Sequence, residues 1–109
     1  MIIPIDAEIA IEKVRDYLLV SMDVDDKSGY LSLAGYSRED YWILLRDIRE
    51  QLLPGVGVYQ ERNEYGVYYI LEGHVVGPNE RRLGVRTIWL HEVSGRIRFL
   101  TLFPDHWKQ

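Results

Sequence analysis

Hydrophobic residues change their spacing halfway along the chain, and residues 1–55 carry a helical spacing. Apolar side chains recur there every three or four positions, which places them along one side of a helix. Ser37 is a suitable N-cap for the last of these stretches, and Pro54 and Gly55 end it. Helices are therefore expected at residues 6–19, at 30–34 and between Ser37 and Pro54.

Residues 56–104 carry the pattern of β-strands. Four runs rich in β-branched and aromatic residues alternate with short segments that contain glycine, proline, serine or asparagine. These runs span residues 56–61, 65–76, 82–91 and 96–103. Short connections between consecutive strands imply an antiparallel meander. The sequence predicts an α+β fold with N-terminal helices packed on a C-terminal four-stranded antiparallel meander sheet.

Alternation along the strands assigns side chains to the two faces of this sheet. In the third strand, Thr87 and Trp89 share one face and Arg86 and Ile88 share the other. The last strand is expected to present one face with four members, namely Ile97, Phe99, Thr101 and Phe103. The two faces are about equally apolar, so the face without helices is a candidate surface for a partner chain.

Composition limits the classes to which the protein can belong. The chain has 109 residues, 47% hydrophobic and 28% charged, which fits a single domain over residues 1–109. Because cysteine is absent, a disulfide scaffold, a thiol nucleophile and an iron–sulfur cluster are excluded. No apolar run is long enough for a transmembrane helix, and the N-terminus does not resemble a secretory signal. We expect a cytoplasmic protein that does not enter a membrane.

Charge is distributed unevenly. The net charge of −4 excludes a generally basic nucleic-acid-binding protein. Residues 1–55 contain 6 Lys and Arg against 11 Asp and Glu, whereas residues 56–109 contain 7 against 6. Arginines gather on the last two expected strands and at their ends: Arg81, Arg82, Arg86, Arg96 and Arg98. Such a concentration can bind phosphate groups or an acidic partner.

No motif for a metal, a cofactor or a serine nucleophile is present. His74 and His91 could meet across neighbouring strands, but two histidines alone make a weak metal site. Asp23, Asp25 and Asp26 resemble a calcium loop, yet the required glycine and final glutamate are missing. We expect neither a metal nor another cofactor.

Six side chains could instead support metal-free phosphate chemistry: Lys13, Tyr17, Lys27, Arg86, Thr87 and Thr101. Lys13 and Tyr17 are four residues apart and share one side of the first expected helix. Lysine and arginine stabilise the charge of a phosphorane, and tyrosine or lysine can transfer protons. Structural roles are the alternative: solvation by Lys13, a core position for Tyr17, and a cross-strand ion pair between Arg86 and Glu72.

Aromatic residues are abundant on the expected sheet. The chain has 8 tyrosines and 3 tryptophans. Those on the sheet are Tyr59, Tyr65, Tyr68, Tyr69 and Trp89. They could form a base-stacking platform, a protein interface or ordinary packing between strands.

Several motifs follow one another in a familiar order. They are Glu-Lys-Val-Arg-Asp-Tyr at 12–17, Leu-Ala-Gly-Tyr at 33–36, Gly-Pro-Asn at 77–79, Val-Arg-Thr-Ile-Trp at 85–89 and Arg-Phe-Leu-Thr-Leu-Phe-Pro at 98–104. Together they resemble a bacterial family, largely cyanobacterial, catalogued as domain of unknown function 6883. The resemblance covers nearly the whole chain and implies no established activity.

The resemblance does imply a toxin-like setting. Members of the family are similar to stand-alone proteins of two-gene toxin–antitoxin arrangements and to the ends of larger toxin-like or phage-like proteins. The order of helices and strands is similar to the barnase–EndoU–colicin–RelE class of ribonucleases, which is an analogy at the level of fold. Some members carry a histidine before the lysine that matches Lys27, whereas the loop at 21–26 is acidic here.

Two hypotheses follow. The first is a toxin-like, metal-free ribonuclease that acts on RNA and has a small antitoxin-like partner. In it, Lys13, Lys27 and Arg86 bind phosphate, while Tyr17, Thr87 and Thr101 orient groups or transfer protons. The second is a non-catalytic interaction module or homodimer that docks through aromatic and arginine side chains of the sheet. Convergence of the proposed phosphate ligands with Thr101 would favour the first.

Overall fold

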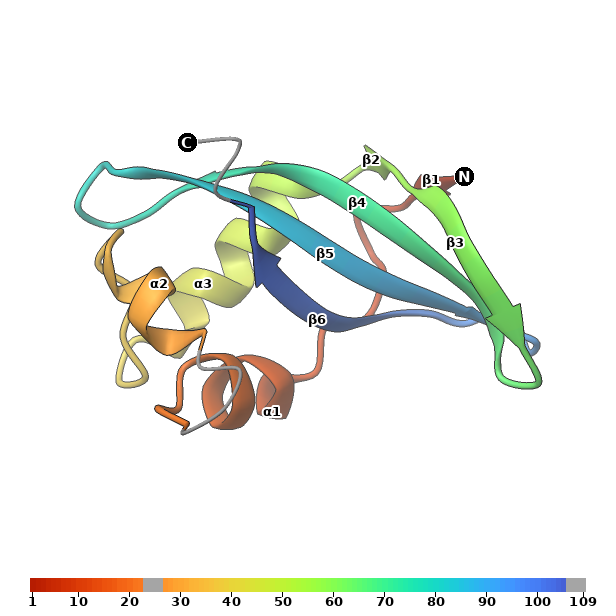
Figure 1. Cartoon of the computed structure of the whole chain (residues 1–109), viewed down its shortest axis with the longest axis horizontal. Coiled ribbons are helices and arrows are strands. Elements are labelled where there is room, and N and C mark those ends of the chain that lie inside the picture. The colour runs from red at the N-terminus through yellow and green to blue at the C-terminus, as the bar shows by residue number, and fades with distance from the viewer. Residues whose placement is uncertain (23–26, 106–109) are drawn as a thin grey trace.

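The computed structural model describes residues 1–22 and 27–105 and confirms the predicted α+β architecture (Figure 1). The helical segments are α1 (Ile11–Lys13), the π-helical η1 (Val14–Leu18), α2 (Ser28–Ser32), α3 (Tyr41–Asp47) and the π-helical η2 (Ile48–Leu52). The strands are β1 (Ile2–Ile3), β2 (Gly55–Val56), β3 (Val58–Asn63), β4 (Gly66–Val76), β5 (Arg82–Glu92) and β6 (Ile97–Pro104).

The main sheet is the predicted meander. Strands β3, β4, β5 and β6 lie side by side in sequence order, and each pair is antiparallel. The four expected strands agree with the observed ones to within two residues at either end. A second, small sheet of β1 and β2 was not predicted, and in it Ile2 pairs with Val56.

The hydrophobic core lies between α3–η2 and one face of the sheet. Leu44, Ile48 and Leu52 of the expected apolar stripe are buried, which confirms the helical spacing in this segment. The sheet contributes Leu71, Val75, Leu83, Val85, Trp89, Phe99 and Leu102. Figure 1 shows α3 crossing behind the long strands β4 and β5, and α1 lying beside β6.

Two expected helix starts were too early. The first helix begins at residue 11 rather than 6, because the backbone of Glu8 pairs with the edge of β6. The N–H of Glu8 donates to the carbonyl of Ile97 over 2.9 Å, and its carbonyl accepts from the N–H of Phe99 over 2.7 Å. Ser37 does accept a bond from the N–H three residues later, at 3.4 Å, but α3 itself begins only at Tyr41.

A β-bulge in β6 changes the faces that alternation predicted for this strand. Ile88 of β5 pairs with Thr101, whereas the next residue, Trp89, pairs with Phe99. Leu100 is therefore left without a partner on β5, and the alternation of side chains shifts by one residue. The prediction that Thr101 shares a face with Phe99 is wrong for this reason.

The bulge brings Thr101 and Phe103 to the face of Arg86. Phe103 pairs directly with Arg86, so these two side chains share a face of the sheet. Leu102, by contrast, pairs with Thr87 on the core face and is buried. Bulges of this kind commonly re-aim side chains next to functional sites.

Candidate functional site

Lys27 is the centre of a polar cluster beside β6. It lies immediately before α2 and is only 5% exposed. Its ammonium group, Nζ, donates to the hydroxyl of Tyr17 over 2.6 Å and to Oγ1 of Thr101 over 3.0 Å. Three segments that are distant in sequence thus meet at one side chain.

Aromatic rings complete the surroundings of this charge. Nζ of Lys27 lies 4.5 Å from the ring centroid of Tyr17 and 4.5 Å from that of Phe103. Both distances lie within the range of attractive cation–π interactions. Among the ion pairs of residues 1–22 and 27–105, none involves Lys27. We call Tyr17, Lys27, Thr101 and Phe103 the Lys27 cluster.

Buried neighbours fix each segment of the Lys27 cluster. Val14 and Leu18 are fully buried and attach η1, which carries Tyr17, to the core. Leu31 does the same for α2, and its N–H donates to the carbonyl of Lys27 over 3.0 Å. The bulge in β6 supplies Thr101. The cluster is therefore positioned by the packed core rather than by a surface loop.

Arg86 lies next to the Lys27 cluster on the same face of the sheet. It pairs across the strands with Phe103 on one side and with Glu72 on the other. The predicted ion pair with Glu72 is present at 3.7 Å, and both side chains are about half exposed. An exposed pair at this distance contributes little stability. Arg86 therefore combines a weak structural role with a position opposite Phe103 of the Lys27 cluster.

Thr87 does not belong to this site. It lies on the core face and is completely buried. Its hydroxyl donates to the carbonyl of Leu71 over 2.8 Å and accepts from the indole Nε1 of Trp89 over 2.8 Å. Both hydrogen bonds of the Thr87 hydroxyl are therefore made inside the core, one with β4 and one with Trp89.

Lys13 makes no direct polar contact with Lys27 among the described residues. It is half-buried at the end of α1. Of the six candidates, the structure brings Tyr17, Lys27 and Thr101 into contact and places Arg86 beside them. Phe103, which sequence reasoning did not select, joins them because of the bulge.

The concentration of arginines is less basic than the sequence suggested. Arg96 forms ion pairs with Glu8 and Glu92, and Arg98 pairs with Glu92 over 2.9 Å. The hydrogen bond from Arg96 holds the pKa of Glu8 below its usual range. Most of this positive charge is compensated within the fold, so the arginines do not form one open basic surface.

The two histidines on the sheet do not meet. His74 pairs with Gly84 and His91 pairs with Val67, at opposite ends of the β4–β5 ladder. In residues 1–22 and 27–105, no group of three histidine, aspartate or glutamate side chains is close enough to hold a metal ion. The aspartates at 23, 25 and 26 lie outside the described residues.

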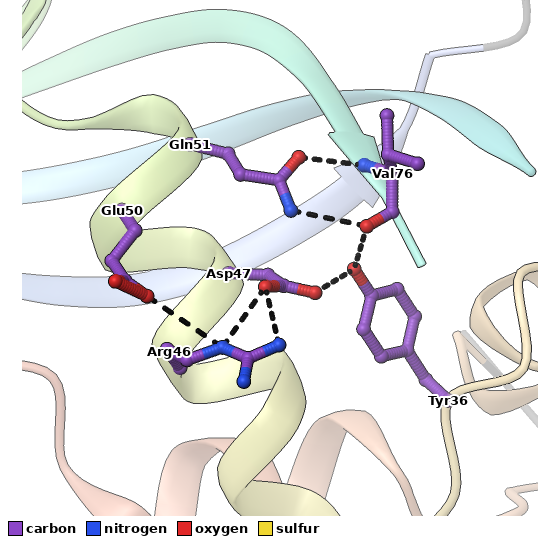
Figure 2. Close-up of polar contacts among 6 residues, drawn as sticks. All are labelled: Tyr36, Arg46, Asp47, Glu50, Gln51 and Val76. Atoms are coloured by element: carbon purple, nitrogen blue, oxygen red, sulfur yellow. Dashed lines mark hydrogen bonds and ion pairs between the residues drawn. The ribbon is translucent and has the colours of Figure 1, made fainter. Parts of the chain in front are cut away.

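A second buried charge, Asp47, lies in a separate polar cluster (Figure 2). The hydroxyl of Tyr36 donates to Oδ2 of Asp47 over 2.7 Å, and Arg46 lies 3.3 Å from Oδ1. Nearby, the amide of Gln51 forms two hydrogen bonds with the backbone of Val76. Burial and the carboxylate both raise the pKa of Tyr36. This cluster connects α3, the end of β4 and the segment before α3, and sequence patterns gave no sign of it.

One hollow lies elsewhere, between η1 and the start of α3. It has a volume of about 440 Å³ and is lined by Arg15, Arg38, Glu39 and Tyr41. Asp16 forms ion pairs with both arginines, at 2.7 and 2.9 Å, and its pKa is lowered by them. Because these charges already compensate one another, the hollow is a weaker candidate than the Lys27 cluster.

Together these features define a small α+β domain with a buried, hydroxyl-bonded lysine at one edge of an antiparallel meander. The chain belongs to the family described as a domain of unknown function (DUF6883), which matches residues 5–106. No curated protein matches it in sequence.

Among solved structures, the fold is similar to a chain of the contact-dependent growth inhibition toxin–immunity protein complex from Klebsiella pneumoniae 342. The TM-score is 0.67 and the identity 17%, over 89% of this chain and 98% of that chain. At this identity the likeness concerns the fold. None of the described helices is long and apolar enough to span a bilayer.

Proposed function

We propose that this protein is a toxin-like ribonuclease that works without a metal ion and is controlled by a small partner protein. The observation that carries the proposal is the environment of Lys27. This buried ammonium group contacts hydroxyls and aromatic rings and forms no ion pair within residues 1–22 and 27–105, so its positive charge can act on an anion that reaches the cluster. Arg86 offers a second cation on the same face, opposite Phe103.

The candidate roles follow from the contacts. Lys27 and Arg86 bind the scissile phosphate and stabilise the negative charge that develops on it. Thr101 orients the ammonium group of Lys27 through its 3.0 Å hydrogen bond. Tyr17 donates a proton, because a cation that donates to a phenol oxygen stabilises the phenolate left behind.

The reaction needs no oxidant or cofactor. The 2′-hydroxyl of RNA attacks the adjacent phosphorus, and the bond from phosphorus to the 5′-oxygen breaks. The 2′-hydroxyl proton passes to solvent, and the 5′-oxygen takes a proton from Tyr17, which then recovers one from solvent. The products are a 2′,3′-cyclic phosphate and a free 5′-hydroxyl.

The proposed partner covers the same site. A small protein that presents carboxylates would pair with Lys27 and Arg86, since carboxylate and phosphate suit the same cations. The similar fold of a chain from a toxin–immunity protein complex supports both the toxin-like role and the partner.

The test is cleavage of single-stranded RNA by purified protein in EDTA. We expect cleavage with cyclic-phosphate ends, and we expect Lys27→Met to reduce its rate at least about 100-fold. Lys13→Met is the matched control, because it removes a lysine that lies outside the Lys27 cluster, and it should retain the activity. Intact RNA after incubation with wild-type protein would refute the ribonuclease.

A second candidate function, an interaction module, is supported by β3. This edge strand has six residues, all of them exposed, including Val58 and Tyr59. Among the described residues, only β4 pairs with it. An open strand edge can accept a strand from another protein.

Light scattering coupled to size-exclusion chromatography tests the second candidate in its simplest form, a homodimer. A dimer that Tyr59→Lys converts to a monomer would support it, because a charge on an edge strand opposes pairing. A strictly monomeric wild type would exclude self-association through β3.

A further inference from the structure

Phe103 is an aromatic side chain that the core does not need. It is 41% exposed, whereas Phe99, the other phenylalanine of the chain, is 1% exposed. Phe99 packs edge-on against Trp89 with ring centroids 5.3 Å apart. Phe103 instead lies on the opposite face, with Nζ of Lys27 at 4.5 Å from its ring centroid. Phe103 therefore lies outside the core packing that holds Phe99, and its ring contacts a cation instead.

The neighbours of Phe103 are the proposed phosphate ligands. Arg86 lies directly opposite on β5, and side chains paired in this way have Cβ atoms about 4.5–5.5 Å apart. Lys27 contacts the ring itself. A flat apolar surface thus lies between two cations, one on the adjacent strand and one before α2.

This combination fits one part of a nucleic acid well. Each nucleotide carries an aromatic base and a phosphate a few ångströms apart, and proteins that bind single strands combine cationic side chains with aromatic stacking. The only partner of Arg86 on the sheet face among the described residues is Glu72, at 3.7 Å in an exposed pair. A phosphate can take the place of that carboxylate at little cost.

We infer that Phe103 is the stacking platform for a nucleobase of the RNA substrate, with Arg86 binding the adjoining phosphate. The inference rests on the proposed function and deepens it, because it assigns the residue that holds the base next to the scissile bond. Stacking tolerates different bases, so this contact favours single-stranded RNA without fixing a sequence.

The test measures binding separately from cleavage. The probe is a fluorescein-labelled, single-stranded 2′-O-methyl RNA of mixed sequence, which cannot be cleaved because its 2′-oxygen is blocked. Fluorescence anisotropy gives the dissociation constant for each variant. We expect Phe103→Leu to weaken binding about tenfold, and Phe103→Trp to restore it to within about twofold of wild type.

Two further variants make the comparison specific. Tyr59→Leu removes a ring that is more exposed than Phe103 from the far edge strand, β3, and should leave the dissociation constant unchanged. Phe103→Met provides a second non-aromatic variant in case leucine impairs folding, which near-ultraviolet circular dichroism reports. Both non-aromatic variants should bind equally weakly.

The outcomes separate this inference from the ribonuclease proposal. If Phe103→Leu binds as tightly as wild type, the platform is wrong, even if the wild type cleaves RNA. If wild type binds the probe through Phe103 but leaves unmodified RNA intact, the platform stands and the ribonuclease is wrong. Absence of binding by wild type overturns the platform, whereas the ribonuclease proposal is decided by the cleavage assay alone.

Discussion

Two tyrosine–charge pairs lie in this small domain, and they differ in the sign of the charge. Tyr17 accepts a hydrogen bond from Lys27 over 2.6 Å, and Tyr36 donates one to Asp47 over 2.7 Å. Both charged residues are 5% exposed. The distances are similar, but the two phenols have opposite hydrogen-bonding roles, because Tyr17 is the acceptor and Tyr36 is the donor.

The difference lies in where the phenol hydrogen goes. Asp47 accepts the hydrogen of Tyr36, and burial of the phenol, followed by the carboxylate, raises the pKa of Tyr36. Lys27 donates to the oxygen of Tyr17, so the phenol oxygen of Tyr17 is the acceptor in this contact. We therefore expect the first arrangement to stabilise the fold, and we assign proton donation to the second only within the proposed ribonuclease.

The surroundings of the two charges differ as well. Arg46 lies 3.3 Å from Asp47, so a cation partly compensates the carboxylate. Aromatic rings and a threonine hydroxyl surround Lys27, and Arg86 adds positive charge nearby. Buried charges without an ion-pair partner are costly and are commonly retained for function.

Removal of the charge of Asp47 or of Lys27 should therefore change the free energy of unfolding by the most unequal amounts. Asp47→Ala should lower the free energy of unfolding by about 2–3 kcal/mol, because it leaves the hydroxyl of Tyr36 without its strong acceptor. Lys27→Met should change that free energy by less than about 1 kcal/mol, since methionine replaces a buried charge with an apolar chain of similar length. Urea denaturation followed by circular dichroism measures both.

Glu50→Ala is the matched control on the same side of the molecule. Glu50 forms an exposed ion pair with Arg46 at 3.6 Å, so its removal should cost less than about 0.5 kcal/mol. Equal losses of stability for Asp47→Ala and Lys27→Met would contradict the distinction between the two clusters.

Sequence patterns were sufficient for the sheet because alternation and turn residues are local signals. The four strands and their order followed from them, and so did the buried stripe of α3 and η2. The first helix was less predictable. A single backbone pairing between Glu8 and β6 overrides the helical spacing of residues 6–10, and no local signal reports such a contact.

The site was only partly predictable for a similar reason. Lys27, Tyr17 and Thr101 were selected by residue type, but no periodicity relates them, because they come from three separate segments. Alternation put Thr101 on the face of Phe99, since the bulge at Leu100 has no clear sequence signature. Alternation correctly put Thr87 on the face of Trp89. Residue type alone gave no reason to expect the hydroxyl of Thr87 inside the core.

Substitutions that remove only the phenol hydroxyl of Tyr17 or Tyr36 should have smaller effects and compare the two clusters more directly. Tyr17→Phe should reduce the rate of RNA cleavage about tenfold to 100-fold, because it removes the proposed proton donor and keeps the ring near Lys27. Tyr36→Phe should leave the rate unchanged and lower the free energy of unfolding by about 1 kcal/mol. Cleavage assays and urea denaturation of both variants measure these two effects. A loss of activity in Tyr36→Phe would contradict the distinction between the two phenols.

The smallest expected effect is a decrease, at alkaline pH, of the stability that Tyr36 contributes to the fold. Its pKa in the folded protein is raised above the ordinary value of 10.0, by burial first and by Asp47 second. Above pH 10 the unfolded chain therefore loses this proton while the folded protein keeps it. The contribution of Tyr36 to stability is consequently present below pH 10 and falls as the pH rises further. Urea denaturation at several pH values measures how much larger the free energy of unfolding is for wild type than for Tyr36→Phe. This difference should be constant from about pH 6 to 8, because phenols are protonated in both states there, and should shrink above pH 10. A difference that stays constant up to about pH 11 would mean that Asp47 does not hold the proton on Tyr36, and the contrast with Lys27 would then rest on activity alone.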